Sequence, residues 1–136
     1  VVVAQRLVRK LCAEKEEYIP EDAELAALAR IVDMDRMLGL LKKENVVAPD
    51  ATWKTIKLFR TKKSADCEDG YSGRVGIHEV LKVSPSIKEL ILKHASEDEI
   101  QEQAKKEGMM TMIEDGIMLV VRGQTTTEEV LRVVSE

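Results

Sequence analysis

The spacing of apolar residues predicts a helix at the start of the chain. Ala4, Leu7, Val8 and Leu11 recur at the intervals of one helical face, and the residues between them are polar or basic. The charged segment 13–18 lacks such spacing and predicts a loop. The opening of the chain therefore indicates a short helix followed by a break.

Two more helices are predicted in the next part of the chain. Pro20 with acidic residues directly behind it is typical of a first helical turn, because negative charge there favours the helix dipole. A second helix is expected at about 34–44, and Asn45 is typical of a helix end. Gly39 weakens that segment by up to about 1 kcal/mol relative to alanine.

The middle of the chain predicts strands. Residues 52–60 are rich in β-forming side chains, and a second strand is expected at 74–81. The polar segment 61–70 between them predicts a loop. Two strands around a loop indicate a hairpin, or two members of a small antiparallel sheet.

Four helices are predicted after residue 83. The first is expected to begin near Pro85. The other three are expected to begin at hydroxyl side chains that can accept hydrogen bonds from a first helical turn, at Ser96, Thr111, and Thr126 or Thr127. Ser96 and Glu99 also have the spacing of a capping box. Gly108 and Gly123 are expected helix stops.

The helix expected after Thr111 is apolar on more than one side. Beyond a core face, Met110, Met118 and Val121 extend its apolar surface. Such a helix is either buried on both sides or offers a contact surface. Burial under residues 19–45 and a partner surface, to which adaptable methionines are suited, both stay open.

Composition limits the classes of function. The 136 residues are 44% hydrophobic and 34% charged with a net charge of −4, enough for one modest domain or two small subdomains. A mildly acidic chain has no electrostatic attraction to nucleic acid or anionic lipid. No apolar run approaches the roughly 20 residues that cross a membrane, and no secretory signal is recognisable. The two cysteines make no disulfide framework and are expected to be reduced, as in a cytoplasm.

Three blocks of the sequence carry a more specific signal. Residues 70–79 read GYSGRVGIHE, in which glycines surround one arginine and predict a tight turn leading into a strand. Residues 4–12 read AQRLVRKLC, and residues 123–133 read GQTTTEEVLRV. In their order along the chain, the blocks resemble the patterns A-Q-R-L-V-R-K-L-C, G-Y-x-G-R-x-G-I-x-E and G-x-T-T-x-E-E-V-L-R-V of the assembly ATPases of type II secretion and type IV pili. The resemblance spans nearly the whole chain except about 19–60.

The resemblance implies an α+β, mainly α fold made of three pieces. Residues 1–12 would be the tail of a RecA-like ATPase core. Residues 13–82 would be a subdomain of degenerate metal-binding type with a helical insertion and a β-hairpin. Residues 83–136 would be a C-terminal helical subdomain. The chain begins with three valines and no methionine, which suggests a cut made inside a larger protein.

The implied function is that of the C-terminal region of a cytoplasmic hexameric ATPase that powers type II secretion or type IV pilus assembly. The chain has no G-x-x-x-x-G-K-[ST] phosphate loop, so ATP and magnesium are expected to bind elsewhere in the parent protein. The fragment itself would be a structural and interaction module. Its expected partners are the rest of the ATPase, neighbouring subunits, and an inner-membrane platform protein that would hold it at the membrane periphery.

Three other functions were weighed against this one. A stand-alone regulatory or adaptor module of the same systems and an ATPase of DNA uptake both stay open. A nucleic-acid-binding, zinc-ribbon-like module would need intact cysteine pairs and a basic face, and the sequence has neither.

The resemblance gives roles to few residues. Arg6 and Arg9 would lie beside the nucleotide-bearing core, although a solvated helix face is the simpler interpretation. No catalytic residue is expected, because the histidines His78 and His94 have no nucleophile at a recognisable spacing. The residues of the second block that match the family pattern are expected to be architectural: Gly70, Tyr71, Gly73, Arg74, Gly76 and Glu79. Glu79 is expected to form a structural ion pair, with Arg74 as the candidate base.

A zinc site is expected to be lost. Many members of the resembled family carry two C-x-x-C pairs whose four thiolates would hold a tetrahedral ion. Here each pair keeps a single cysteine, Cys12 and Cys67. Asp66, Glu68 or His78 could complete a site on paper, but nothing in the spacing supports them. The sequence therefore predicts no metal and two ordinary reduced cysteines.

Overall fold

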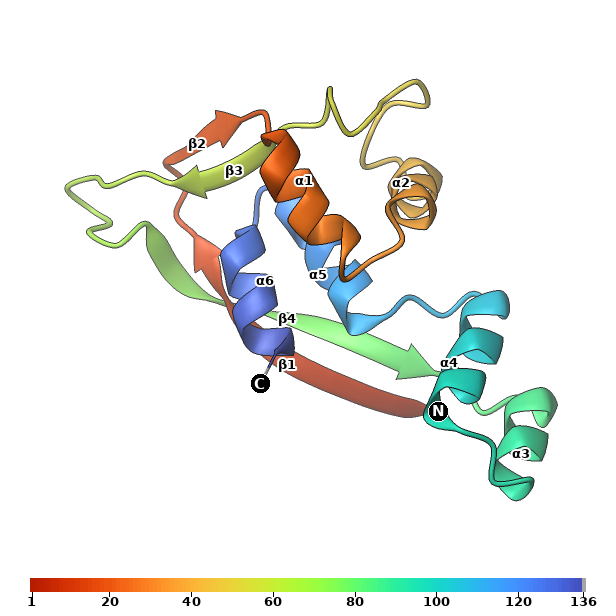
Figure 1. The fold of residues 1–136 in the computed structure, drawn as a ribbon. Coiled ribbons are helices and arrows are strands. Elements are labelled where there is room, and N and C mark those ends of the chain that lie inside the picture. Colours follow the sequence, from red (N-terminus) through yellow and green to blue (C-terminus); the bar gives the residue numbers. More distant parts are fainter. Residues whose placement is uncertain (136) are drawn as a thin grey trace.

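The computed structural model describes residues 1–135, which form an α+β fold of six helices and four strands (Figure 1). In chain order the elements are β1 Val2–Leu11, β2 Lys15–Tyr18, α1 Asp22–Ala29, α2 Met34–Lys43, β3 Leu58–Thr61, β4 Tyr71–Leu81, α3 Pro85–Leu92, α4 Glu97–Lys106, α5 Met112–Val121 and α6 Thr127–Val134. Within residues 1–135, no helix has the length and apolar character needed to span a membrane.

The longest feature of the fold is an antiparallel ribbon of β1 and β4, which Figure 1 shows running across the molecule. Its register runs from Val2 opposite Leu81 to Arg9 opposite Arg74. The predicted helix over residues 4–11 is therefore wrong. The helical spacing of its apolar residues was outweighed by valine-rich β propensity and by backbone hydrogen bonds to a strand about 70 positions away, which no local pattern reveals.

The second sheet pairs β2 with β3, from Lys15 opposite Thr61 to Tyr18 opposite Leu58. The predicted loop at 13–18 thus contains a strand, and the strand expected at 52–60 is shorter and begins later. The predicted hairpin between the strands at 52–60 and 74–81 is also wrong, because β3 pairs with β2 and β4 pairs with β1. The chain leaves the ribbon after β1 and rejoins it at β4. We call the intervening residues 13–66 the excursion.

Local helix signals were more reliable than strand signals. Ser96, Thr111 and Thr126 cap α4, α5 and α6 as predicted, each accepting a hydrogen bond from a first-turn amide. Helix α3 begins at Pro85 as predicted, and Ser84 caps it in the same way. A reciprocal capping box forms at Thr111, with Glu114. Gly108 and Gly123 have φ angles of 101° and 80°, which suits their predicted role as helix stops.

The main core lies between the excursion and the C-terminal helices. Figure 1 shows α5 and α6 between the ribbon and the pair α1 and α2. The buried cluster joins Leu28, Met37 and Leu41 of the excursion to Ile117 and Met118 of α5. Met118 is only 2% exposed, which favours burial under the excursion over a partner surface for this methionine. A smaller cluster of Val8, Ile77 and Val133 ties the ribbon to α6.

Candidate functional site

A buried glutamate on the first turn of α6 organises the candidate site. Glu129 is 2% exposed, and its carboxylate accepts hydrogen bonds from the backbone amide and the guanidinium of Arg9, each at 2.9 Å. The guanidinium of Arg132 donates to both carboxylate oxygens, at 3.1 and 3.2 Å. Burial alone would raise the pKa of Glu129, but the hydrogen bonds from Arg9 and Arg132 outweigh it and lower the pKa to about 2. The carboxylate is therefore charged and held in place.

Tyr71, at the start of β4, completes this cluster. The guanidinium of Arg9 lies over the Tyr71 ring, 4.3 Å from its centre. The Tyr71 hydroxyl and the Thr126 hydroxyl are 2.9 Å apart and share a hydrogen bond. Stacking and the ion pair together orient the guanidinium of Arg9, whose side chain is still 47% exposed.

Backbone contacts bind the end of β1 to the same loop before α6. The amide of Leu11 donates to the carbonyl oxygen of Gln124 at 2.8 Å. The Thr125 hydroxyl donates to the carbonyl oxygen of Arg9, also at 2.8 Å. Residues 4–12, 70–79 and 123–133 are far apart in the sequence, yet all three blocks meet here.

A known protein family matches nearly all of the chain, including almost the whole of these three blocks. The model of the family described as Type II/IV secretion system protein matches residues 1–132. The chain belongs to this family.

Its relatives come from both kinds of system. The type IV pilus assembly ATPase PilB of Pseudomonas aeruginosa is 33% identical over 138 residues, covering 100% of this chain and 21% of that protein. Type II secretion system protein E of Xanthomonas campestris is 37% identical, covering 99% of this chain and 21% of that protein. The type IV pilus assembly ATPase PilB of Thermus thermophilus is 36% identical, covering 96% and 13%. The chain thus spans about a fifth, or less, of the length of these relatives.

The two arginines singled out from the resemblance differ in their surroundings. Arg9 is committed to Glu129 and Tyr71. Arg6 lies opposite Ile77 in the ribbon and is exposed. Both lie on a strand, so the alternative of a solvated helix face no longer applies.

In the glycine-rich block, Gly70 directly precedes β4, while Gly73 lies within the strand where its register with β1 shifts. Gly70 and Gly73 have φ angles of 86° and 76°, a conformation that side chains with a Cβ rarely adopt. A Cβ added at Gly70 would collide with Thr61, whereas one at Gly73 would meet open space. Gly76 lies within β4, opposite Leu7.

Glu79 has a different partner from the one expected. Its carboxylate accepts a hydrogen bond from the amide of Met112 at 3.3 Å, at the first turn of α5. The described residues 1–135 include no ion pair between Glu79 and Arg74, so that pairing is wrong. Glu79 instead fastens α5 to the ribbon.

A second buried glutamate, which the sequence reasoning missed, fastens the excursion to α5. Glu114 is 3% exposed and accepts from Arg36 of α2 at 2.7 Å. Its second oxygen accepts from the amide of Thr111 at 2.8 Å, which closes the capping box. Burial opposes the charged form of Glu114, but these hydrogen bonds prevail and lower its pKa. The T-x-x-E spacing at 111–114 and at 126–129 was the signal that could have found both glutamates.

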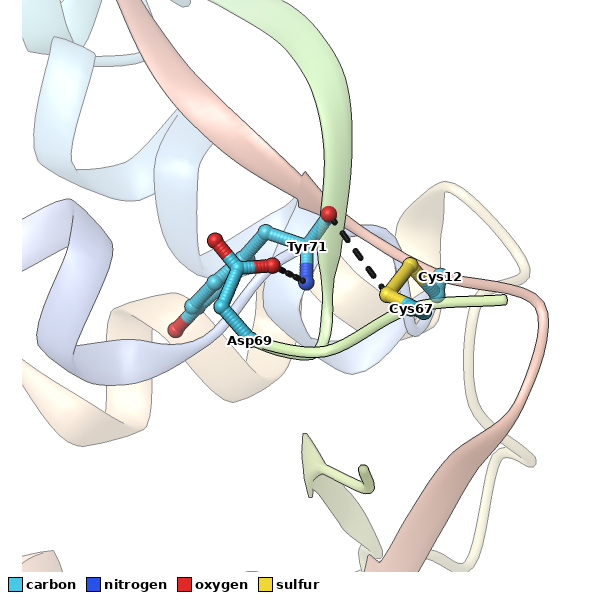
Figure 2. The surroundings of a disulfide bond; sticks show 4 residues. All are labelled: Cys12, Cys67, Asp69 and Tyr71. Carbon is cyan, nitrogen blue, oxygen red and sulfur yellow. Dashed lines mark hydrogen bonds between the residues drawn. A yellow bond between two sulfur atoms is a disulfide. The ribbon is translucent and has the colours of Figure 1, made fainter. Parts of the chain in front are cut away.

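The two cysteines form a disulfide, which Figure 2 shows beside Tyr71. The expectation of two reduced cysteines is therefore wrong. Antiparallel pairing of β1 with β4 brings the two ends of the excursion together, and the amide of Cys12 donates to the carbonyl oxygen of Gly70 at 3.0 Å. A sequence separation of 55 residues gave no sign of this proximity. Within residues 1–135, no three side chains of His, Cys, Asp or Glu are arranged to hold a metal ion.

The histidines lie outside the cluster. The His78 amide donates to Asp115 at 2.8 Å, and its ring Nδ1 is 3.8 Å from the same carboxylate. His94 follows α3 with a φ angle of 57°. The candidate site thus offers oriented guanidinium groups and a structural junction, a chemistry suited to holding elements together and to contacting another surface.

Proposed function

We propose that this chain is the C-terminal region of an ATPase that powers type II secretion or type IV pilus assembly, and that it acts there as a structural and interaction module. The observation that carries the proposal is the family match over residues 1–132, whose three blocks meet at Glu129. ATP and magnesium would bind in the rest of the longer protein, because this chain has no phosphate loop.

The ribbon is the proposed attachment to the rest of the enzyme. On the face opposite Val8 and Ile77, Val3, Leu7 and Val80 are 59%, 47% and 49% exposed. The second edge of β1 has no strand partner among residues 1–135. A two-stranded ribbon with an apolar open face is marginal alone and gains stability from further strands or a covering layer. We propose that residues 1–12 are the tail of a RecA-like core that supplies this cover.

The two arginines would have separate roles, because Arg6 alternates with Leu7 along β1 and therefore lies on the other face of the ribbon. Arg9 is held by Glu129, so its role is to orient the junction, while Arg6 is available to a partner surface or a nucleotide bound to the core. Residues 13–82 and 83–136 would then form the subdomains that contact adjacent subunits of a hexamer and a platform protein at the inner membrane. No nucleic acid partner is proposed for this acidic chain.

Two measurements test the proposal. Titration of Mg-ATP into the 136-residue chain should give no calorimetric signal, whereas micromolar binding would contradict it. In the longer ATPase, Leu7→Lys should lower ATP hydrolysis by disturbing the covered face of the ribbon. In the isolated chain the same substitution should leave the unfolding midpoint nearly unchanged.

The matched control is Leu7→Ile, which keeps an apolar side chain of the same size on the open face of the ribbon. It should leave hydrolysis by the longer protein intact. Equal activity of the Leu7→Lys and Leu7→Ile variants would show that the open face of the ribbon is not an attachment surface.

A further inference from the structure

We propose that Cys12 and Cys67 form a reversible clamp at the base of the excursion, closed by small-molecule disulfides and opened by small thiols. The pair lies where the chain leaves the ribbon and where it returns, separated by 55 residues. When the bridge is closed, the two ends of the excursion are joined covalently. When it is open, only noncovalent contacts hold them.

Covalent closure acts mainly on the unfolded chain. A link across a loop of this length removes much of the conformational freedom that the excursion gains on unfolding. We expect the reduced protein to keep both cysteines close together, since the amide of Cys12 is hydrogen-bonded to the carbonyl oxygen of Gly70 independently of the bridge. Oxidation therefore requires little rearrangement of the fold.

The excursion has independent attachments that survive opening of the clamp. Leu28, Met37 and Leu41 are buried against α5. Arg36 is paired with Glu114, and the Lys15 ammonium donates to the carbonyl oxygen of Gly123 at 2.6 Å. The reduced protein should therefore stay folded, with its loosening concentrated near residues 62–70.

The clamp also contacts the Glu129 cluster. The sulfur of Cys67 lies 3.5 Å from the carbonyl oxygen of Tyr71, the residue whose ring stacks on Arg9 (Figure 2). Cys12 directly follows Leu11, which is bonded to Gln124. Opening the clamp should therefore increase local mobility at Tyr71 more than at the distant helices α3 and α4.

The clamp closes by thiol–disulfide exchange with oxidised glutathione. One cysteine thiolate attacks a sulfur of oxidised glutathione, forming a mixed disulfide and releasing one glutathione thiolate. The second cysteine thiolate then attacks the protein sulfur of that mixed disulfide and releases a second glutathione thiolate. Two protein thiols lose two protons and two electrons, and the small disulfide is reduced to two thiols. Because Cys12 and Cys67 are only 9% and 7% exposed, small thiols should react through local opening of the loop.

The test equilibrates the 136-residue chain in glutathione buffers of graded redox ratio, then measures free thiols and the thermal unfolding midpoint. We expect two thiols to appear cooperatively under reducing conditions, with the midpoint falling by roughly 10 °C while helical content at 25 °C is kept. Cys12→Ser, Cys67→Ser and the double variant should unfold, in every buffer, at the midpoint of the reduced wild-type chain. An unchanged midpoint in the wild-type chain, or two free thiols in every buffer, would overturn the proposal.

Amide hydrogen exchange separates a local clamp from a general stabiliser. On reduction, amides of residues 62–71 and Cys12 should exchange at least about tenfold faster, while those of α4 should be unchanged under conditions where local opening dominates. Uniform acceleration along the chain, or none near Tyr71, would contradict a clamp that acts on the Glu129 cluster.

Discussion

The two buried glutamates begin from the same local sequence and end in different roles. Thr111-x-x-Glu114 and Thr126-x-x-Glu129 both place a threonine cap three residues before the acid. Glu114 bonds back to the amide of Thr111 and closes the box, then binds Arg36 of the excursion. Glu129 turns instead to the amide and guanidinium of Arg9 on β1. A capping motif therefore predicts where a helix starts, while the tertiary partner decides what the acid does.

The largest effect is expected from removing the acid that joins the two ends of the chain. Glu129→Ala should lower the free energy of unfolding by about 3 kcal/mol, because it leaves the amide of Arg9 without its acceptor and releases two guanidinium groups. Urea denaturation measures the loss. Glu128→Ala, at the exposed neighbour on the same turn, should cost much less. Equal losses from the two would show that charge at the helix start, not the junction, matters.

Acid should weaken the Glu129 junction in a defined window. The pKa of Glu129 in the folded protein is lowered from 4.5 to about 2, so its contribution to stability is complete above the unfolded value. That contribution is lost as pH falls from about 5 toward 2. Glu129→Gln should flatten this part of the curve of unfolding free energy against pH. Because the pKa of Glu114 is also lowered, part of the slope should persist. An unchanged slope in Glu129→Gln would contradict a charged, paired Glu129.

A smaller loss is expected at the other glutamate. Glu114→Ala removes a closed capping box and the partner of a half-buried arginine, and should cost about 2 kcal/mol. Thr111→Ala removes only the cap and should cost about 1 kcal/mol. Denaturation of Glu114→Ala, of Arg36→Ala and of the double variant gives the coupling energy between Glu114 and Arg36. Additive losses in that pair would show that Arg36 contributes nothing through Glu114.

A loss similar to that of Thr111→Ala, or somewhat larger, is expected at the start of β4, next to the Glu129 junction. Gly73→Val should destabilise the fold by more than about 1 kcal/mol, since its φ of 76° strains a β-branched residue although the space around it is open. Gly39→Val is the matched control, because Gly39 is equally open but lies within α2. Arg74→Ala, which removes an exposed guanidinium, should cost less than Gly73→Val. An unfolding midpoint unchanged in Gly73→Val would show that the turn is permissive.

Features that depend on neighbouring residues could be predicted from the sequence, whereas features that depend on distant segments could not. The caps at Ser96, Thr111 and Thr126 and the stops at Gly108 and Gly123 depend on neighbours within four positions, so they were predictable. The strand β4 was predictable from its own residues.

The β1 strand was mistaken for a helix because its apolar positions at 4, 7, 8 and 11 have helical spacing, and eight residues are too few for that spacing to decide the structure. Which one forms depends on β4, far along the chain, whose backbone supplies the missing hydrogen bonds.

By itself, the sequence determined the family, the α+β class, and the starts of the C-terminal helices with the stops at Gly108 and Gly123. Only the tertiary structure decided that β1 is a strand, that β2 pairs with β3, that Cys12 meets Cys67, and that Glu129 holds Arg9. The first group depends on steric limits and hydrogen bonds within a few residues. The second depends on which distant segments satisfy one another's backbone groups and buried charges, and these are settled only when the chain folds as a whole.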